Sequence, residues 1–160
     1  MRQKITDLSS TDNFFIKINT QGEWFANNVI IVNKEILNYC KQNLHKDQQG
    51  IYILNKFHAL EEKVYLHIEG PLLKVLKINK NKLLLENNEE IDENDAQLVE
   101  FHTQIYLKIP SLQCWASFSR QALFDLSELL ESVEETYFWN KKTIQHVPAI
   151  KWDSGYIENV

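Results

Sequence analysis

The chain has 160 residues, enough for one domain or for two small subdomains that share a core. Apolar residues make up 44% of it, which argues against a largely disordered protein. The net charge of −5 disfavours nucleic acid as a partner, because phosphate binding requires concentrated positive charge. The N-terminal segment lacks a signal-peptide pattern and no apolar run is long enough to span a membrane, so we expect a cytoplasmic protein.

The first part of the chain predicts a hairpin followed by a helix. Residues 14–18 alternate apolar and polar side chains, Gly22 suits a tight turn, and Trp24 begins the returning strand. Asn33 can cap a helix, because its side chain can accept backbone N–H groups of the first turn. The residues expected to form the buried stripe of this helix are Ile36, Leu37, Cys40 and Leu44.

Residues 50–71 predict two strands with a concentration of polar side chains. Alternation along the second strand puts Tyr65, His67 and Glu69 on one face. The bend before it adds further polar residues, namely His58, Glu61 and Glu62. Three interpretations of this face remain open: a solvated surface, a binding groove, and a metal or acid–base site, since residues two apart on a strand can share a ligand.

The middle of the chain predicts a hairpin and then a break. Residues 71–85 fit two strands joined by a lysine-rich turn. Residues 86–95 carry six carboxylates and no basic residue, which is typical of a solvated loop, and they lack the spacing of a calcium loop. We therefore expect an N-terminal subdomain over residues 1–85, an acidic connector over 86–100 and a C-terminal subdomain over 101–160.

The second half repeats the order of the first. A hairpin over residues 104–118 precedes Ser119, which can cap a second helix. The apolar stripe expected for that helix comprises Leu123, Leu126, Leu130 and Val133. The recurrence of hairpin and helix predicts an α+β fold of two small subdomains with a repeated antiparallel hairpin-plus-helix unit.

Other residue types point to structure rather than chemistry. Cys40 and Cys114 lie among apolar residues without a CxxC motif, so we expect buried free thiols. Trp24 and Trp115 are expected in the core, whereas Trp152 and a tail tyrosine, Tyr156, are better placed to line a cleft. No phosphate loop or nucleophile elbow is present, and we expect neither a cofactor nor a bound metal.

A set of short motifs follows a fixed order from about residue 14 to residue 157. The residues concerned are Gly22, Trp24, Gly50, Tyr52, Glu61 or Glu62, Ile68, Glu69, Pro71, Leu72, Leu112, Ala116, Arg120, Trp152, Ser154 and Gly155. In this order the chain resembles the bacterial family known as domain of unknown function 1285. The resemblance implies a two-subdomain α+β fold, an unassigned biochemical role and a part in signal transduction through ligand or partner binding, and it implies no catalytic residues.

The chain departs from that family pattern at three positions. The second acid of a Val-Glu-Asp motif is Gly70 here, the Phe that follows is Leu72, and Asp153 interrupts a Trp-Ser-Gly motif. These departures mark a distant member. If the second acid binds a ligand in the relatives, this chain binds it differently or not at all.

Two residues have a structural and a functional interpretation each. Glu69 precedes a bend, where its carboxylate can accept unpaired backbone N–H groups. Arg120 can pair with Glu69 or Asp125, or bind an anion at a helix N-terminus.

We favour a non-catalytic module that binds a small molecule or a protein partner in a groove between the two halves. The expected groove residues are Glu61, Glu69, Arg120 and Trp152. One alternative is a hydrolytic enzyme, with or without a metal, that uses His58, Glu62, His67 and Glu69. Another is an interaction protein that forms a homodimer through an exposed hairpin edge.

Overall fold

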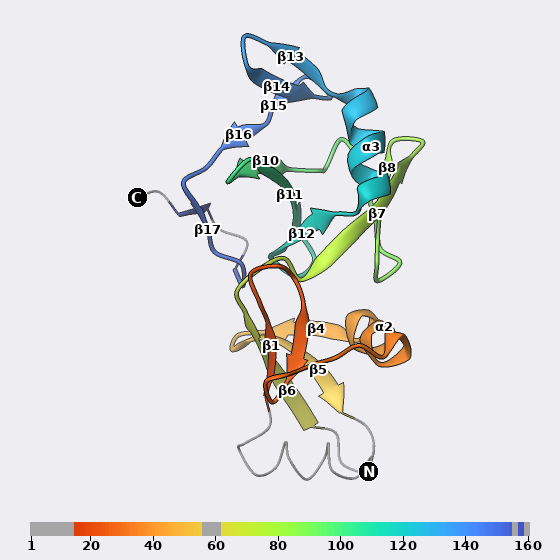
Figure 1. Cartoon of the computed structure of the whole chain (residues 1–160), viewed down its shortest axis with the longest axis vertical. Coiled ribbons are helices and arrows are strands. Elements are labelled where there is room, and N and C mark those ends of the chain that lie inside the picture. The colour runs from red at the N-terminus through yellow and green to blue at the C-terminus, as the bar shows by residue number, and fades with distance from the viewer. Residues whose placement is uncertain (1–14, 56–61, 155–156, 159–160) are drawn as a thin grey trace. The chain divides into compact units, whose positions relative to one another are not determined.

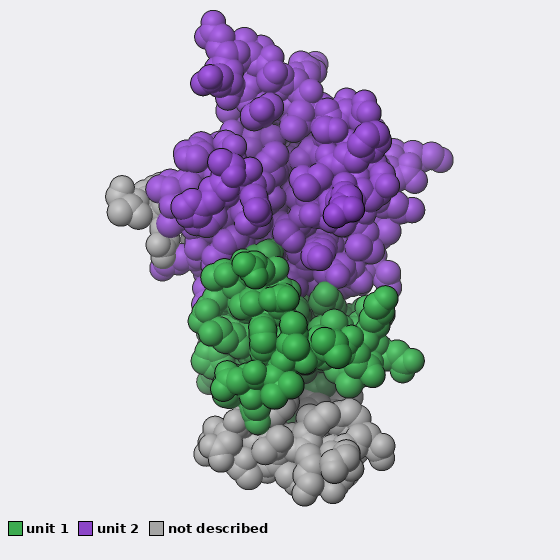
Figure 2. Space-filling model, in the orientation of Figure 1, with its two compact units in different colours: residues 1–71 green, residues 72–160 purple. Residues whose placement is uncertain are grey.

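The computed structural model describes residues 15–55, 62–154 and 157–158 (Figure 1). The chain divides into two compact units, residues 1–71 and residues 72–160, which we call unit 1 and unit 2 (Figure 2). The described part contains both helix and sheet, so the predicted α+β class is confirmed, with strands in large excess over the two helices. No helix in the described ranges is long and apolar enough to cross a membrane.

Unit 1 is built on a six-stranded sheet with the order β3-β2-β1-β6-β5-β4 (Figure 1). Its strands are β1 (Ile16–Ile18), β2 (Trp24–Ala26), β3 (Val29–Ile30), β4 (Leu44–Asp47), β5 (Gly50–Asn55) and β6 (Glu62–Ile68). The central pair β1 and β6 is parallel, and the other pairs are antiparallel. The predicted hairpin at Gly22 is confirmed, since this residue has a φ of 81° in the turn between β1 and β2.

One face of this sheet carries the core of unit 1. Because side chains alternate along a strand, the buried residues fall on a single face. They include Ile16, Ile18, Trp24, Ile51, Ile53 and Val64. The predicted core position of Trp24 is thus confirmed.

Helix α2 (Lys34–Gln42) begins where the sequence predicted. Asn33 is its N-cap, and its side chain accepts from the backbone N–H groups of Glu35 and Ile36. The predicted apolar stripe is wrong in part, because Cys40 is buried whereas Ile36 remains 47% exposed. Leu44 does not belong to the helix at all, since the chain turns into β4 after Gln42.

Unit 2 contains a seven-stranded sheet with the order β16-β10-β11-β12-β7-β8-β9. These strands are β7 (Leu73–Asn79), β8 (Lys82–Leu85), β9 (Glu90–Asp92), β10 (Leu98–Phe101), β11 (Gln104–Ile109), β12 (Cys114–Phe118) and β16 (Gln145–His146). A small sheet comprises β13 (Glu131–Val133), β14 (Thr136–Trp139) and β15 (Lys142–Thr143), and a pair comprises β17 (Ala149–Ile150) and β18 (Ile157–Glu158). The predicted hairpins at 71–85 and 104–118 are confirmed.

Both faces of the unit 2 sheet are covered in part. Helix α3 (Arg120–Leu129) packs on β7 and β12, and Ser119 caps it by accepting from the Ala122 N–H as predicted. Val133 lies in β13, and Leu123 is 48% exposed, so the predicted stripe of α3 holds only around the buried Leu126. The opposite face buries Val99, Tyr106 and Trp115 against Val147, Ile150 and the half-buried Trp152.

The acidic segment is more ordered than its charge suggested. Within residues 86–95 the structure places strand β9 with Ile91 buried, whereas the rest of the stretch forms turns, so the predicted solvated loop is wrong in part. The predicted subdomains 1–85 and 101–160 stay a prediction, and in the structure the contacts divide the chain between Pro71 and Leu72. A repeated hairpin-plus-helix unit is not established by the described elements. Cys40 and Cys114 are buried and are not joined in a disulfide, as expected.

Candidate functional site

The exposed face of the unit 1 sheet brings three rings into a row across neighbouring strands. The strand register places His45 opposite Tyr52, and Tyr52 opposite Tyr65. Adjacent ring centres are 5.4 Å apart in both pairs, within the range of favourable aromatic contacts. We call these residues, together with Asp47 and Lys63, the ring cluster.

Asp47 joins the charged and aromatic members of the ring cluster. Its carboxylate accepts the Tyr65 hydroxyl at 2.6 Å and the Lys63 ammonium at 2.9 Å. It also accepts the Gln49 backbone N–H at 2.8 Å, which belongs to the turn between β4 and β5. The Lys63 ammonium lies 4.7 Å from the centre of the Tyr52 ring, a cation–π distance. Polar and stacking contacts therefore fix the same side chains.

These contacts move the pKa values of the cluster away from neutrality. The hydrogen bonds from Tyr65 and then Lys63 lower the pKa of Asp47 from 3.8 to about 2. The hydrogen bond to Asp47 raises the pKa of Lys63 and also the pKa of Tyr65. At neutral pH Asp47 is consequently a carboxylate, Lys63 an ammonium and Tyr65 a neutral phenol.

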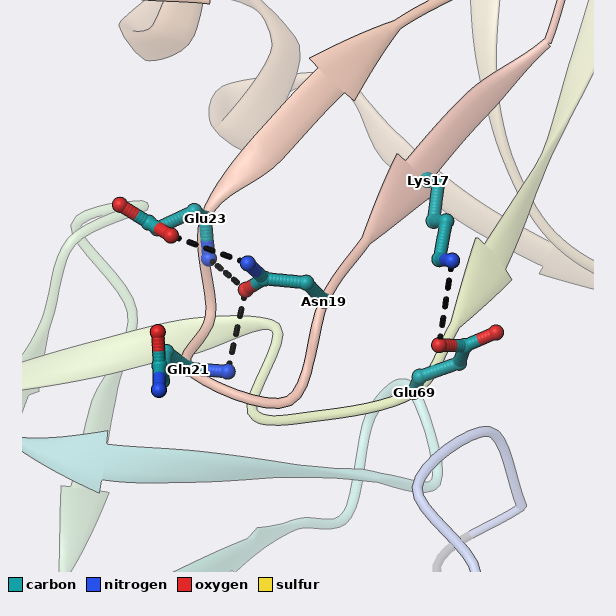
Figure 3. A network of polar contacts seen from close by, with 5 residues as sticks. All are labelled: Lys17, Asn19, Gln21, Glu23 and Glu69. Carbon is teal, nitrogen blue, oxygen red and sulfur yellow. Dashed lines mark hydrogen bonds and ion pairs between the residues drawn. The ribbon is translucent and has the colours of Figure 1, made fainter. Parts of the chain in front are cut away.

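The same face continues onto β1 and the end of β6. Lys17 lies beside His67 in the parallel register, and the Phe15 ring meets the His67 ring edge-on at 6.1 Å. The Lys17 ammonium lies 3.4 Å from the Glu69 carboxylate (Figure 3). Both side chains are well exposed, so this ion pair contributes little to stability. The prediction that His67 and Glu69 share a face with Tyr65 agrees with this register.

The turn between β1 and β2 borders this face, and Asn19 organises it (Figure 3). The Asn19 side-chain oxygen accepts the backbone N–H groups of Gln21 and Glu23 at 3.0 and 2.9 Å. Its amide donates to the Glu23 carboxylate at 2.9 Å. Glu69 was expected to bind unpaired backbone N–H groups, but its described contact is the ion pair with Lys17, and Asn19 performs that role in the turn.

Gly70 explains one departure from the family pattern. A Cβ atom at this position would lie 2.1 Å from the Asn19 carbonyl oxygen and 2.8 Å from the Thr20 backbone. Real Cβ atoms do not approach backbone so closely, so the β1–β2 turn excludes any side chain here. An acid at this position therefore requires a different turn.

The predicted groove residues do not form a described cluster. Glu61 lies outside the described residues, as does His58 of the alternative site. Glu69 belongs to unit 1, whereas Arg120 and Trp152 belong to unit 2. Trp152 packs its ring against Tyr106 at 4.9 Å, which makes it part of a core rather than a free cleft wall. The other cleft candidate, Tyr156, also lies outside the described residues.

Arg120 is exposed at the first position of α3. No ion pair links it to a described carboxylate. Asp125, one predicted partner, instead accepts the Ile78 backbone N–H at 3.0 Å and the Gln121 amide at 2.8 Å.

The alternative hydrolytic set is not assembled on one face. Alternation along β6 directs Glu62 to the face opposite His67 and Glu69. Within the described ranges no three His, Cys, Asp or Glu side chains are grouped closely enough to hold a metal ion.

The sequence predicted the polar face of β6 but not the polar residues of β4. His45 and Asp47 went unnoticed because no strand was predicted over residues 44–47. Lys63 lies in the predicted strand β6 but was not singled out. The signal was the two-residue spacing of His45 and Asp47 before Gly50, which is typical of one face of a hairpin strand. Assigning that hairpin would have placed His45 opposite Tyr52.

Two solved structures share the fold. The chain is similar to a DUF1285 family protein from Silicibacter pomeroyi DSS-3, with a TM-score of 0.57 and 13% identity over 91% of this chain and 78% of that chain. It is also similar to a DUF1285 family protein from Shewanella baltica OS155, with a TM-score of 0.51 and 12% identity over 72% of this chain and 91% of that chain. The resemblance seen in the sequence is thus confirmed at the level of the fold. No family model matches the sequence, and no curated protein is significantly similar to it.

Proposed function

We propose that the protein is a distant DUF1285 relative that acts as a non-catalytic binding module, with its ligand surface at the ring cluster. One observation carries the proposal: aligned rings and a fixed ion pair lie together on an exposed sheet face. Such a face offers both stacking area and directional hydrogen bonds, the two requirements of a selective small-molecule site. A part in signalling, which the resemblance implies, fits a module of this kind.

The pKa shifts favour recognition over acid–base catalysis. A general acid or base works best with a pKa near the operating pH. In the ring cluster the pKa of Asp47 moves down, and the pKa values of Lys63 and Tyr65 move up. Each group therefore keeps one protonation state through the neutral range, which suits the binding of a ligand with fixed complementary groups.

The side chains indicate the class of ligand. His45 is exposed at the end of the row, and its ring has no hydrogen-bond partner among the described residues. A flat ring stacked at this end would lie close to the Asp47 carboxylate, which accepts hydrogen bonds. The ligand expected is a polar compound with a flat ring or a sugar ring that carries hydroxyl or amino donors.

Thermal-shift screening tests this function on the full chain. The panel would contain mono- and oligosaccharides, nucleosides and nucleotides, and aromatic amino acids. A compound that raises the melting temperature would then be titrated by calorimetry against the Tyr52→Ala variant. We expect the variant to bind about tenfold more weakly, because one stacked ring is worth about 1–3 kcal/mol.

Tyr39→Ala is the matched control, since Tyr39 is an exposed tyrosine of α2 outside the ring cluster. The Asp47→Asn variant removes the charge and leaves the rings in place. A ligand that binds both cluster variants as tightly as the native chain would place the site elsewhere. Turnover of a ligand at the ring cluster would contradict the non-catalytic assignment.

A further inference from the structure

The sheet of unit 1 ends at an uncharged edge strand. In the strand order β3 stands outermost, and among the described strands it pairs only with β2. Residues 24–33 contain no charged side chain, and residues 29–32 are all apolar. An edge of this kind is a ready template for another strand, because its outer N–H and C=O groups have no strand to bind.

The exposed apolar side chains of unit 1 gather at this edge. Among the described residues of the unit, the large apolar side chains that are exposed all fall between residues 29 and 39. Val29, Ile30 and Val32 are 68%, 42% and 75% exposed, and the other two, Ile36 and Tyr39, lie on α2. Exposed apolar surface concentrated in one place marks an interaction site.

The other edges of the two large sheets carry charge. The opposite edge of the unit 1 sheet is β4, which contains Lys46 and Asp47. In the unit 2 sheet, β9 is acidic at two of its three residues, and β16 has the Glu100 carboxylate beside it, 3.5 Å from His146. Charges at an edge discourage pairing with another strand. In the part of the chain that the structure describes, β3 is therefore the edge of these two sheets that lacks this protection.

The ladder between β2 and β3 determines which backbone groups of the edge can meet a partner. The Ile31 N–H donates to the Trp24 carbonyl at 2.8 Å, so Ile31 directs its backbone groups toward β2. Successive residues of a strand direct their N–H and C=O groups to opposite sides. Ile30 and Val32 consequently direct theirs away from the sheet, where an added strand would bind them.

We propose that two copies of this chain form a dimer through antiparallel pairing of residues 29–33. Ile31 would face Ile31 of the second copy, and Ile30 of each copy would exchange backbone hydrogen bonds with Val32 of the other. Apolar side chains then lie opposite apolar side chains, which stabilises an antiparallel pair.

The ends of the apolar run select this register. A slip of two residues in one direction would pair Asn28, whose φ of 69° belongs to the turn between β2 and β3. A slip of two residues in the other direction would pair Lys34, the first residue of α2. A slip of one residue would set outward-directed backbone groups opposite inward-directed ones. The register centred on Ile31 avoids all three faults.

A second copy suits this edge better than an unrelated strand for two reasons. It supplies the same uncharged run, so the pairing buries no charge. A two-fold pair also covers the β3 edge of both copies, so the association closes at a dimer and does not grow into a fibre. The proposal concerns the end of the unit 1 sheet opposite to β4, and it is independent of the ligand site at the ring cluster.

Sedimentation velocity over a concentration series of the full chain tests the dimer. We expect a monomer–dimer equilibrium, because a short edge pairing buries little surface. Val32→Lys sets a cation opposite Ile30 in each copy, at a position exposed in the monomer, and should raise the dimer Kd at least about tenfold. Leu76→Lys is the matched control, because Leu76 is an exposed leucine of β7, which lies inside the unit 2 sheet and not at its edge.

Cysteine substitutions test the register in the full chain. Ile31→Cys should form an intermolecular disulfide on mild oxidation, because facing residues of such a pair have Cα atoms about 4.5 Å apart. Val29→Cys is more exposed but would lie four residues, about 13 Å, from its counterpart, which is too far for a disulfide. The native chain is the control, since Cys40 and Cys114 are buried and should not crosslink.

Three results would overturn the proposal. The first is a monomer at every concentration, and the second is a dimer that Val32→Lys leaves as tight as in the native chain. The third is a disulfide in Val29→Cys and none in Ile31→Cys. Circular dichroism would establish that Val32→Lys is folded, and the Ile31→Cys crosslink gives a result that does not depend on that variant.

Discussion

Asp47 keeps its charge because two side-chain donors and one backbone N–H converge on it. Its folded-state pKa of about 2 lies below the ordinary value of 3.8. A carboxyl group with a lowered pKa stabilises the fold fully above its ordinary pKa, and this contribution disappears as the pH falls toward the folded-state value. Asp47 should therefore support unit 1 at neutral pH and lose that effect between about pH 4 and pH 2.

The Tyr65→Phe substitution tests the cause of this shift. The hydroxyl of Tyr65 is the largest contributor, so its removal should return the pKa of Asp47 part of the way toward 3.8. Carboxyl-carbon chemical shifts followed by NMR from pH 7 to pH 2 would measure the change. Tyr39→Phe serves as the control, because that tyrosine lies in α2. An unchanged Asp47 titration in Tyr65→Phe would show that the hydrogen bond does not hold the carboxylate in its charged form.

At the scale of elements, the bend after β6 and the turn between β1 and β2 restrict each other. The β1–β2 turn approaches Gly70 through main-chain atoms of Asn19 and Thr20, which cannot rotate away as a side-chain end can. A Gly70→Ala change must therefore displace one of the two backbone segments. We expect a loss of about 1–3 kcal/mol in the free energy of unfolding, as in other overpacked sites, measured by urea denaturation.

Glu69→Ala is the comparison for that experiment. It changes the adjacent residue, removes only the exposed ion pair with Lys17, and should cost less than about 1 kcal/mol. If Gly70→Ala proved as stable as the native chain, the β1–β2 turn could shift to make room for a Cβ atom at residue 70. The absence of an acid at this position would then have no steric explanation.

Local sequence patterns predicted those elements whose signals lie within a few residues. Asn33 and Ser119 act as caps through bonds to the next turn, and the alternation in β6 separates its faces without reference to other strands. The parallel pairs of β1 with β6 and of β7 with β12 were not predicted, because they join segments distant in the chain. Their register depends on packing that no short window contains.

Because short sequence windows contain no information on tertiary packing, errors also arose at the ends of the helices, at β9 and at the candidate site. Both helix stripes were extended too far, to Leu44 and Val133, because apolar spacing continues after the backbone has left the helix. The strand β9 was missed because carboxylates surround its one buried residue, Ile91. His67 and Glu69 could be placed on one face from their spacing alone, whereas His45 needed the pairing of β4 with β5.

At the scale of the whole molecule, each unit has its own sheet, so a local change should act within one unit. Trp152 provides a test, because its ring packs on Tyr106 at 4.9 Å within the unit 2 core. The neighbouring Lys151 carbonyl accepts the Trp115 indole N–H at 3.2 Å, which gives the tail a second attachment. Trp152→Ala should lower the stability of unit 2 by about 2 kcal/mol, since a half-buried ring is lost.

Hydrogen exchange followed by mass spectrometry would locate the effect of Trp152→Ala along the chain. We expect faster exchange in β10, β11 and residues 145–152, and unchanged exchange in β5 and β6 of unit 1. Asp153→Ala, at an exposed neighbouring position, is the control and should leave both units unchanged. Equal acceleration in both units would mean that they unfold as one cooperative body. Unchanged exchange in unit 2 would mean that the hydrogen bond from Trp115 to the Lys151 carbonyl is enough to hold residues 145–152 in place.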